Sequence, residues 1–442
     1  MTPSEVLPEG ESGPLQAGTA LAEAPPPGPG NTVGEPSRGS GLTRLLTRYN
    51  TTVVTALAIF SAFVVGAVVM IATSPQALAA WASFPSNPGG AVITSWTLVA
   101  TAYAALLGGS LGNPGAYLHA FTTRTPAAFD TAFNPLSETL VAAAPLLLAG
   151  LSVSLAFKAG LFNIGGPSQV IAGAITAGWV GMTMPGLPLV VHMPLAVLAG
   201  LAGGAVAGWI PGILRARTGA NEVIVTIMLN YVALNLLVYL LSLPVFLPSG
   251  HANAISRPTL PSAQMPLLAG AGLRVNAGIV LAALVTVAVA LLLRRTTLGF
   301  HIRMLGASPG AARAAGVSSP RTITVVFVLA GGMCGLAGAV EILGVSNQLV
   351  PNYGLTIGFT AIIVALLGRA RPGGVALAAL LFGAFQAGGL QMQASTSVPI
   401  ELVQVIEAVI VFFIAAPALI RAIYRIRTTG GGLRLISQGW GG

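Results

Sequence analysis

Ten long apolar runs follow one another along this chain of 442 residues, and they constrain its fold more than any other feature. A helix of about 20 apolar residues crosses the ~30 Å hydrocarbon core of a bilayer. Only 7% of the residues are charged, whereas a soluble domain needs roughly 25% to cover its surface. The runs cover residues 52–72, 136–156, 168–184, 188–210, 222–243, 277–293, 321–343, 354–368, 374–390 and 400–418. We therefore predict an all-α fold, a polytopic transmembrane helical bundle of about ten spanning helices.

The two ends of the chain differ from the apolar region between them. Residues 1–43 are rich in Pro, Gly, Ser and Glu, a composition that cannot bury enough apolar surface to fold. We predict a disordered cytoplasmic tail there, a transmembrane domain over 44–427, and a short C-terminal tail over 428–442. Within the apolar region, stretches of small residues such as AGLAGGAVAGW (199–209) permit close packing between helices inside the bilayer.

Basic residues predict the orientation, because cytoplasmic loops of membrane proteins carry an excess of Lys and Arg. With a cytoplasmic N-terminus and ten crossings, 17 of the 20 basic residues fall in cytoplasmic segments, and Arg124, Arg257 and Arg274 fall outside. The predicted external segments are 73–135 and 244–276, and the main cytoplasmic loop is 294–320. The bias towards Arg, Ala and Gly is typical of a GC-rich bacterial genome, so we expect a multi-pass protein of a bacterial plasma (inner) membrane.

The stretch 91–111 is an eleventh apolar run. If it crossed while the later spans kept their orientation, the N-terminus would move outside, and only 14 of the 20 basic residues would remain cytoplasmic. We therefore predict that 91–111 forms an external, interfacial or re-entrant element. The second external segment, 244–276, is rich in proline, and either contacts a soluble partner or simply connects two helices.

The residues that catalysis or metal binding would need are missing or scattered. The chain has one aspartate, Asp130, and one cysteine, Cys334. Its four histidines, His119, His192, His251 and His301, are not spaced as metal ligands. We predict no catalytic residue, no metal centre and no enzyme. Since the Arg residues lie between apolar runs rather than in one patch, we also predict no nucleic-acid partner.

Lys158 is the only lysine of the chain, and this excludes a phosphate-binding loop of the P-loop type. Such a loop needs Gly-Lys-Ser/Thr after a glycine-rich turn, whereas Lys158 lies between SLAF and AGLFN. If ATP drives this protein, another polypeptide must bind it.

The most informative polar segment is RRTTLGFHIRMLGASPGAARAAGVSS (294–319). Ser308 is a suitable N-cap, and Pro309 is tolerated in a first helical turn, where its missing N–H costs nothing. The alanines that follow favour a helix, and Gly316 suits its C-terminal end. We predict a short helix beneath the bilayer, which is what force transfer from a cytosolic motor requires.

This segment resembles the coupling loop of ABC importer permeases in the branched-chain amino acid, ribose and nucleoside permease superfamily. Those permeases carry a Gly-Ala-Asn-Pro-x-Ala-Ala-x-x-x-Gly-Ile pattern. The matching residues are Gly306, Ala307, Pro309, Ala311, Ala312 and Gly316, while Ser308 and Val317 depart mildly from it. The resemblance implies that a separate ATPase subunit hydrolyses ATP and is coupled to the permease through residues 305–317.

Three further segments extend the resemblance in the expected order. They are LSETLVAAAPLLLAGLSVSLAFKAGLFNIGGPSQ (136–169), RARTGANEVIVTIMLNYVA (215–233) and YGLTIGFTAIIVALLGRARPGG (353–374). Together they point to the nucleoside or simple-sugar branch, whose permeases are paired with basic membrane lipoproteins. The implied partners are a cytosolic ABC ATPase, a second permease subunit that forms a heterodimer, an extracytoplasmic solute-binding lipoprotein and membrane lipid. ATP is used by the ATPase, so no cofactor is expected in this chain.

Polar residues in apolar segments are the candidates for a substrate path, because such residues are costly in a membrane and often functional. The polar candidates are Asn163, Gln169, Asn230 and Glu341. The resemblance adds Phe162 and Gly165, because Phe162, Asn163, Gly165 and Gln169 match a segment that typically ends Phe-Asn-Ile-Gly-x-Glu-Gly-Gln in that family. Pro167 and Ser168 stand where the family usually has Glu and Gly, so a carboxylate contact is lost there. The alternative for each polar residue is hydrogen bonding between helices, worth about 0.6–2 kcal/mol.

These observations predict the permease subunit of an ABC importer for nucleosides, with simple sugars as the second choice of solute and branched-chain amino acids as the third. The alternative is a secondary transporter driven by an ion gradient, for which Glu341 and Glu401 are the intramembrane acids at hand. No residue supports a membrane enzyme or a structural scaffold.

Overall fold

A computed structural model describes residues 41–247, 254–396, 398–416, 420, 423 and 424, with side chains from residue 53 onwards. In these residues the chain is helical, and no strand forms beyond a single bridge between Leu267 and Asn276. The predicted tail 428–442 lies outside the described residues. The predicted tail 1–43 also lies outside them, except that residues 41–43 already belong to the first helix. The predicted all-α fold is confirmed.

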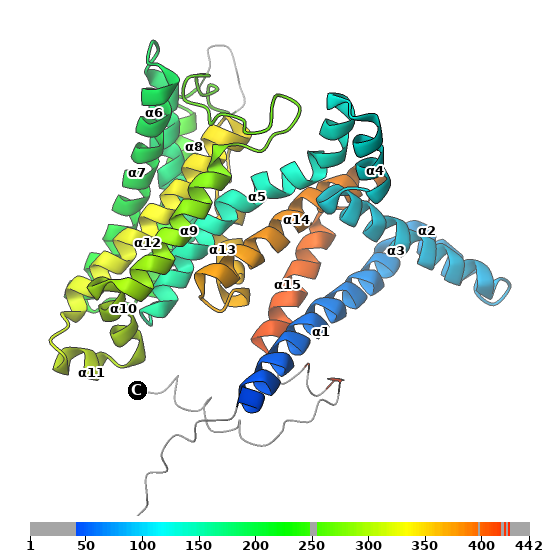
Figure 1. Ribbon diagram of the computed structural model, residues 1–442, viewed down its shortest axis with the longest axis horizontal. Helices are drawn as coiled ribbons and strands as arrows, with labels where there is room; N and C mark the ends of the chain where they lie inside the picture. Colours follow the sequence, from blue (N-terminus) through cyan, green and yellow to red (C-terminus); the bar gives the residue numbers. More distant parts are fainter. Residues whose placement is uncertain (1–40, 248–253, 397, 417–419, 421–422, 425–442) are drawn as a thin grey trace, which may run out of the picture. The chain divides into compact units, whose positions relative to one another are not determined.

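The helices are numbered in chain order. They are α1 (Gly41–Thr73), α2 (Pro75–Ala82), α3 (Pro88–Leu111), α4 (Pro114–Thr123), α5 (Pro126–Lys158), α6 (Gly166–Thr183), α7 (Leu189–Thr218), α8 (Glu222–Leu241), α9 (Ala277–Arg295), α10 (Thr297–Ala307), α11 (Pro309–Ala314), α12 (Ser319–Glu341), the π-helix η1 (Ile342–Ser346), α13 (Leu355–Leu367), α14 (Pro372–Thr396) and α15 (Glu401–Ala415). Figure 1 shows their arrangement.

Eight helices of the described chain are long and apolar enough to cross a membrane. Seven of them contain predicted runs: α1 through Val53–Thr73, then α5, α7, α8, α9, α12 with η1, and α14. The eighth is α3. The remaining runs, 168–184, 354–368 and 400–418, form α6, α13 and α15, which are shorter or less apolar. The prediction of about ten spanning helices therefore agrees with the structure.

Helices α5 and α12 form the buried centre of the bundle. Helix α5 packs against α14, α12 and α13, while α12 packs against α7 and α6 as well. Most of the apolar length of α5 and α12 is buried, whereas only 17% of the apolar window of α8 and 22% of that of α9 is buried. Since lipid tails are as apolar as the side chains of α8 and α9, this exposure is typical of a membrane protein.

The contact between α7 and α12 is made largely by glycine, and we call Gly200, Gly204, Gly208, Gly331 and Gly335 the glycine seam. A Cβ atom added at Gly204 would lie 2.3 Å from the carbonyl oxygen of Gly331, and one at Gly335 would lie 2.2 Å from that of Gly200. Real Cβ atoms essentially never approach other atoms so closely. The two backbones therefore touch directly, as the small residues of 199–209 predicted in general terms.

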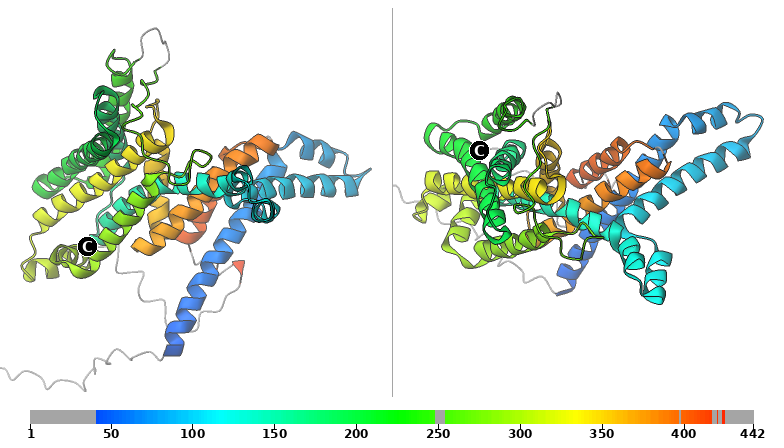
Figure 2. Two further views of the ribbon diagram at one scale, coloured as in Figure 1. Left: turned by 45° about the horizontal axis from the view of Figure 1, so that its top comes forward. Right: turned by 90° about the horizontal axis from the view of Figure 1, so that it is seen from above.

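The C-terminal half of helix α3 is attached to the bundle, where the hydroxyl of Tyr103 donates to the carbonyl oxygen of Phe63 in α1. Near the C-terminal end of α3, the carbonyl oxygen of Ser110 accepts a hydrogen bond of 2.7 Å from Thr139 of α5, and Gly109 lies against Gln391 of α14. Its N-terminal part pairs with α2 and projects away from the other helices (Figure 2). The length and composition of α3 would suffice for a crossing, and the external, interfacial or re-entrant role of 91–111 stays a prediction.

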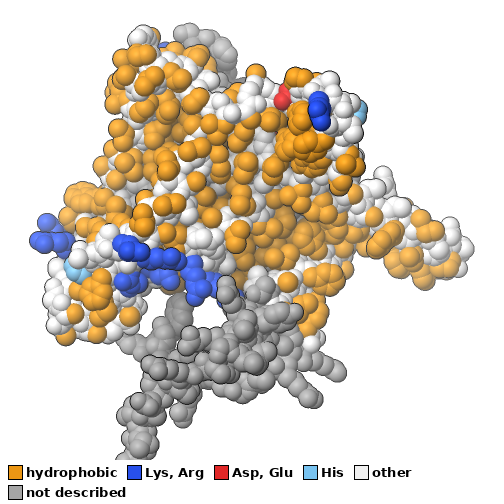
Figure 3. Space-filling model, viewed as in Figure 1, with side chains coloured by type: hydrophobic (Ala, Val, Ile, Leu, Met, Phe, Trp, Pro, Cys, Tyr) orange, Lys and Arg blue, Asp and Glu red, His pale blue; other side chains and the backbone are white. Residues whose placement is uncertain are grey.

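The described surface is divided by charge. Hydrophobic side chains cover the middle of the face shown in Figure 3, and Lys and Arg side chains gather along its lower edge. At this edge α5 ends at Lys158, α9 ends at Arg295, and α10 and α11 follow. We call it the basic end of the bundle.

Candidate functional site

A polar cavity of 440 Å³ lies among α5, α13, α14, α15 and the end of α12. Pockets for small molecules typically measure about 300–1,000 Å³ and combine apolar walls with a few polar groups. Here the walls come from residues such as Val141, Pro145 and Leu390. The polar groups that line the cavity are Glu138, Arg274, Glu341, Tyr353, Thr356, Gln386 and Gln404.

The end of α12 brings Glu341 and Tyr353 to this cavity. After Glu341 the helix widens into the π-helix η1, and the chain then turns at Asn347, which has a left-handed φ of 56°. Single π-turns within helices are frequent at functional sites. Tyr353 is buried, and its hydroxyl lies 3.5 Å from the Oγ of Ser346 at the end of η1. The widened turn thus places a carboxylate and a phenol on one wall.

Arg274 ties the rim of the cavity together. Its Nη1 atom lies 3.0 Å from Oε2 of Glu138 on α5, and its Nη2 donates to the carbonyl oxygen of Val345 in η1 at 3.1 Å. Beside it, the amide of Asn276 donates to the carbonyl oxygen of Gly344 at 2.7 Å. The segment before α9 therefore cross-links α5 to the π-helix at the rim.

Gln386 of α14 and Gln404 of α15 complete the lining from the other side. Within the part of the chain that is described, neither side-chain amide makes a hydrogen bond to another residue. Each amide offers two donors and one acceptor oxygen. With Glu341 and Tyr353, the cavity can bind an uncharged, hydroxyl-rich molecule by several hydrogen bonds.

The predicted path residues at the break between α5 and α6 bind one another. Asn163 donates to Oε1 of Gln169 at 2.9 Å, and Gln169 donates back to Oδ1 of Asn163 at 3.1 Å. Asn230 accepts from the backbone N–H of Ser168 at 3.0 Å and donates to the carbonyl oxygen of Ile164 at 3.0 Å. Both amides of the Asn163–Gln169 pair are buried, so this network satisfies the polar groups of the break without help from a ligand.

This break supports the wall of the polar cavity. A Cβ atom at Gly358 of α13 would lie 2.2 Å from the backbone nitrogen of Pro167, so the start of α6 packs directly on α13. Gly354, which lines the cavity with a left-handed φ of 78°, lies against Val170 in the same way. Pro167 thus makes a packing contact where the resembling family usually carries a carboxylate.

Of the predicted path residues, the structure brings only Glu341 to the polar cavity. Asn163, Gly165, Gln169 and Asn230 lie together behind α13, and Phe162 lies next to them on the chain. Contact of these residues with a solute stays a prediction. Sequence reasoning did not bring Glu138, Arg274, Tyr353, Gln386 and Gln404 together as one group. Glu138 and Tyr353 each lie in a segment that carries the resemblance, and Gln386 is polar within an apolar run, but no pattern links these residues to Glu341.

At the basic end, the predicted short helix exists as α11. The Oγ of Ser308 accepts from the N–H of Ala311 at 3.3 Å, Pro309 occupies the first turn, and Gly316 follows the helix with a φ of 77°. Gly306 lies against the carbonyl oxygen of Lys158, which fixes the segment beneath α5. Ala312 is buried against the bundle, whereas the other matched residues, Gly306, Ala307, Pro309, Ala311 and Gly316, are exposed.

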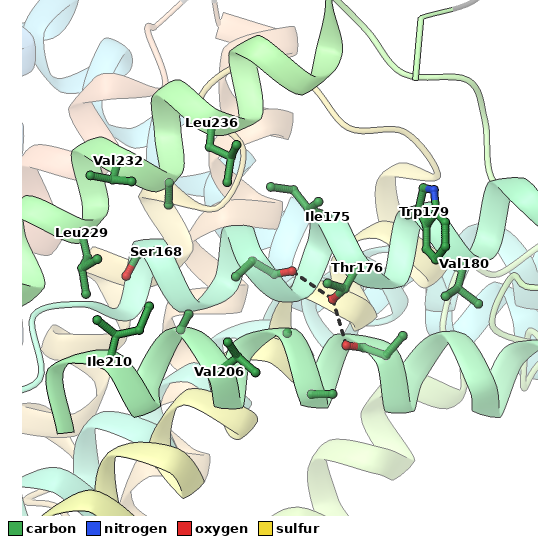
Figure 4. Close-up of a pocket in the computed structure, with 16 residues that line it drawn as sticks. Ser168, Ile175, Thr176, Trp179, Val180, Val206, Ile210, Leu229, Val232 and Leu236 are labelled. Atoms are coloured by element: carbon green, nitrogen blue, oxygen red, sulfur yellow. Dashed lines mark hydrogen bonds between the residues drawn. The ribbon is translucent and has the colours of Figure 1, made fainter. Parts of the chain in front are cut away.

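A second hollow, of 610 Å³, lies among α6, α7 and α8 and is almost wholly apolar. Figure 4 shows its wall, where the hydroxyl of Thr176 donates to the carbonyl oxygens of Ala172 and Ala199 and is thereby occupied. Isoleucine, valine, leucine and alanine side chains form most of the remaining surface. Its lining offers little to a hydrophilic solute, so the polar cavity is the better candidate.

Comparison with known proteins identifies relatives over most of the chain. Residues 135–415 match the family described as branched-chain amino acid transport system, permease component. A nucleoside ABC transporter permease of Lactococcus lactis subsp. cremoris is 37% identical over 64% of this chain and 80% of its own length. A guanosine ABC transporter permease of Bacillus subtilis is 37% identical over 65% and 82%, and a glucose ABC transporter permease of Haloferax volcanii is 38% identical over 63% and 75%. No solved structure matches the chain.

Proposed function

The chain belongs to the family of permease components of branched-chain amino acid transport systems, and on this premise we propose that it is the permease subunit of an ABC importer for nucleosides. The polar cavity is the observation that carries the proposal, because it groups two carboxylates, one guanidinium, one phenol and two amides in a membrane protein. The nearby relatives named for nucleosides, guanosine and glucose are all ABC transporter permeases. The comparison with these relatives thus supports a multi-pass permease, and the assignment of nucleosides as the solute is our inference.

The chemistry of the cavity suits a nucleoside. Ribose hydroxyls and base N–H groups can donate to the carboxylate of Glu341, while the amides of Gln386 and Gln404 can both donate and accept. Val141 and Pro145 offer apolar surface to the face of a base. A simple sugar would use the same polar groups but would leave this apolar surface without a partner, so we rank sugars second.

Replacing Glu341 by Gln tests the solute site. We expect Glu341→Gln to lower the uptake of radiolabelled guanosine about tenfold, since a hydrogen bond to a charged group contributes about 1.5–3 kcal/mol. The matched control is Glu401→Gln, which makes the same change at an exposed residue outside the cavity lining. Equal uptake by Glu341→Gln and the unaltered protein would reject the site. Competition by unlabelled glucose as effective as that by guanosine would assign the cavity to sugars.

We further propose that α11 receives the force of a cytosolic ATPase. The exposed side of α11 carries Ala311 and Ala314, whereas Ala312 faces the bundle. A charge at Ala314 should therefore disturb a partner without disturbing the fold. We expect Ala314→Asp to abolish copurification of the ATPase and uptake. We expect Thr218→Asp, a change at the exposed last residue of α7, to leave both intact. Uptake that continues in Ala314→Asp after ATP depletion would instead favour an ion-coupled transporter.

The proposed orientation places the basic end and the N-terminus in the cytoplasm, and the segment before α9 outside. There it would meet a solute-binding lipoprotein, while a second permease subunit completes the path. Cys334 is fully buried, so introduced cysteines can be labelled above a silent background. On intact cells, a membrane-impermeant thiol reagent should label Leu268→Cys and spare Ala314→Cys. The reverse pattern would invert the orientation and remove α11 from the reach of a cytosolic ATPase.

A further inference from the structure

A hollow at the basic end is not used by the proposed function. It measures 810 Å³ and lies among the ends of α5, α9, α10 and α14. Four cations line it, and no Asp or Glu is among its lining residues. The four are Lys158, Arg294, Arg303 and Arg371. We call it the basic hollow.

The four cations lack a counter-charge in the described part of the chain. The ion pairs found there are Arg215 with Glu222 and Arg274 with Glu138, and neither involves the basic hollow. Arg294, Arg303 and Arg371 are exposed, and Lys158 is half-buried. Four like charges around one hollow repel one another, so an anion that enters the hollow is favoured over an empty one.

One wall of the basic hollow is apolar. Val287, Ala290 and Leu293 of α9 form it, and Val287 is 57% exposed. Along the same helix, Leu284 and Leu291 are also more than half exposed. The hollow therefore opens onto a helix face that suits hydrocarbon. Opposite the apolar wall, Gly373 at the start of α14 leaves open space, because a Cβ atom there would meet nothing within 4 Å.

We propose that the basic hollow binds an anionic phospholipid, with the phosphate among the four cations and the acyl chains along α9. Basic pockets between transmembrane helices on the cytoplasmic side are suited to anionic headgroups. An acidic protein segment would satisfy the cations but would leave the apolar wall uncovered, whereas a phospholipid matches both. The lipid would join the end of α5 to α10 and α14, and α10 leads directly into α11.

The proposal does not depend on the identity of the transported solute, and it is tested by binding alone. The full chain, purified in detergent and stripped of lipid, is mixed with micelles of phosphatidylglycerol or phosphatidylcholine. Thermal unfolding gives the stabilisation, and native mass spectrometry gives the number of lipids retained. We expect phosphatidylglycerol, but not phosphatidylcholine, to raise the Tm by several degrees.

The variant Arg303→Gln with Arg371→Gln should weaken phosphatidylglycerol binding at least about tenfold, because two of the contacting charges are gone. The matched control is Arg217→Gln with Arg321→Gln, which removes two exposed arginines of the same end that do not line the hollow. This control should keep the full Tm shift, and glycerol phosphate without acyl chains should not reproduce it.

Three results would overturn the proposal. Equal stabilisation by phosphatidylcholine would remove the role of charge, and equal stabilisation by glycerol phosphate or inorganic phosphate would leave an anion site without a lipid. A full phosphatidylglycerol shift in the Arg303→Gln, Arg371→Gln variant would move lipid binding elsewhere. Loss of the copurifying ATPase from the Arg303→Gln, Arg371→Gln variant would instead assign the four cations to a contact with the ATPase.

Discussion

Helix α12 passes through two regions of the molecule that are built in opposite ways. Along its middle, the glycine seam brings its backbone against that of α7 with no side chain between them. At its end, the helix widens into η1 and borders a cavity of 440 Å³ whose polar lining residues come from five helices and two connecting segments. The seam has no spare volume, whereas the polar cavity has volume together with the amides of Gln386 and Gln404, which make no hydrogen bond within the described chain.

The difference indicates where shape can change. Backbone contact through glycine leaves no rotamer to adjust, so α7 and α12 must move together or separate completely. The polar cavity is lined by long side chains such as Arg274, Gln386 and Gln404, which can reorient without breaking helix packing. A solute that binds and leaves therefore needs the adjustable side chains of the polar cavity. The glycine seam provides a rigid support for them.

The strongest test of this contrast is a single added methyl group. Gly204→Ala should lower the free energy of unfolding by about 3 kcal/mol or more, since the methyl would lie 2.3 Å from the carbonyl oxygen of Gly331. The matched control is Gly108→Ala on α3, where a Cβ atom meets nothing within 4 Å. There we expect no loss, or a gain of up to about 1 kcal/mol from the better helix propensity of alanine. Thermal unfolding in detergent measures both, and equal shifts would show that the seam is not tightly packed.

A smaller effect is expected at the break behind the cavity. Asn163→Ala should cost about 1–3 kcal/mol, because the amide of Gln169 then stays buried without a partner. Gln169→Ala should cost a similar amount, and the double variant should cost less than the sum of the two. The opposite outcome is that each single variant, and the double variant, unfolds at nearly the same temperature as the unaltered protein while guanosine uptake falls. The Asn163–Gln169 pair would then contact the solute and contribute little to the stability of the fold.

The smallest effect on stability is expected at the rim of the cavity. Glu138→Gln removes the ion pair with Arg274, whose side chain is 55% exposed, and exposed pairs contribute only about 0–1 kcal/mol. We expect unchanged thermal unfolding, with a rate of solute exchange at least doubled because the rim is no longer cross-linked. If Glu138→Gln instead left solute exchange as slow as before and strongly lowered the unfolding temperature, the ion pair would stabilise the fold rather than control access to the cavity.

The sequence predicts the parts of this structure that are local. Each span depends on one apolar run, and α11 depends on Ser308, Pro309 and Gly316 within nine residues of one another, so both follow from neighbouring residues. The glycines of 199–209 indicated a close contact, but not its partner, because α12 lies more than 100 residues further along the chain.

The candidate site could be predicted only in part. Its seven polar residues lie one each on five helices and two connecting segments between residues 138 and 404. Each of these helices is largely apolar, so no periodicity in the sequence marks the side that lines the cavity. Asn163, Gln169 and Asn230 attracted attention because they are polar in an apolar region, which is equally true of residues that bind each other. Only the three-dimensional structure distinguishes an amide that is hydrogen-bonded to another side chain from one that lines the polar cavity.

Lys158, at the edge of the basic hollow, has a practical consequence because arginine replaces lysine everywhere else in the chain. Its Nζ is the single side-chain primary amine of the molecule, so an amine-directed reagent will modify only this side chain. The extent of modification then reports whether Lys158 is accessible or covered by a bound molecule. A lysine-specific protease likewise has one site, between α5 and α6, and would divide the chain into pieces of 158 and 284 residues (442 − 158). Protection from either reagent gives a footprint of whatever fills the hollow, in a chain that needs no prior engineering.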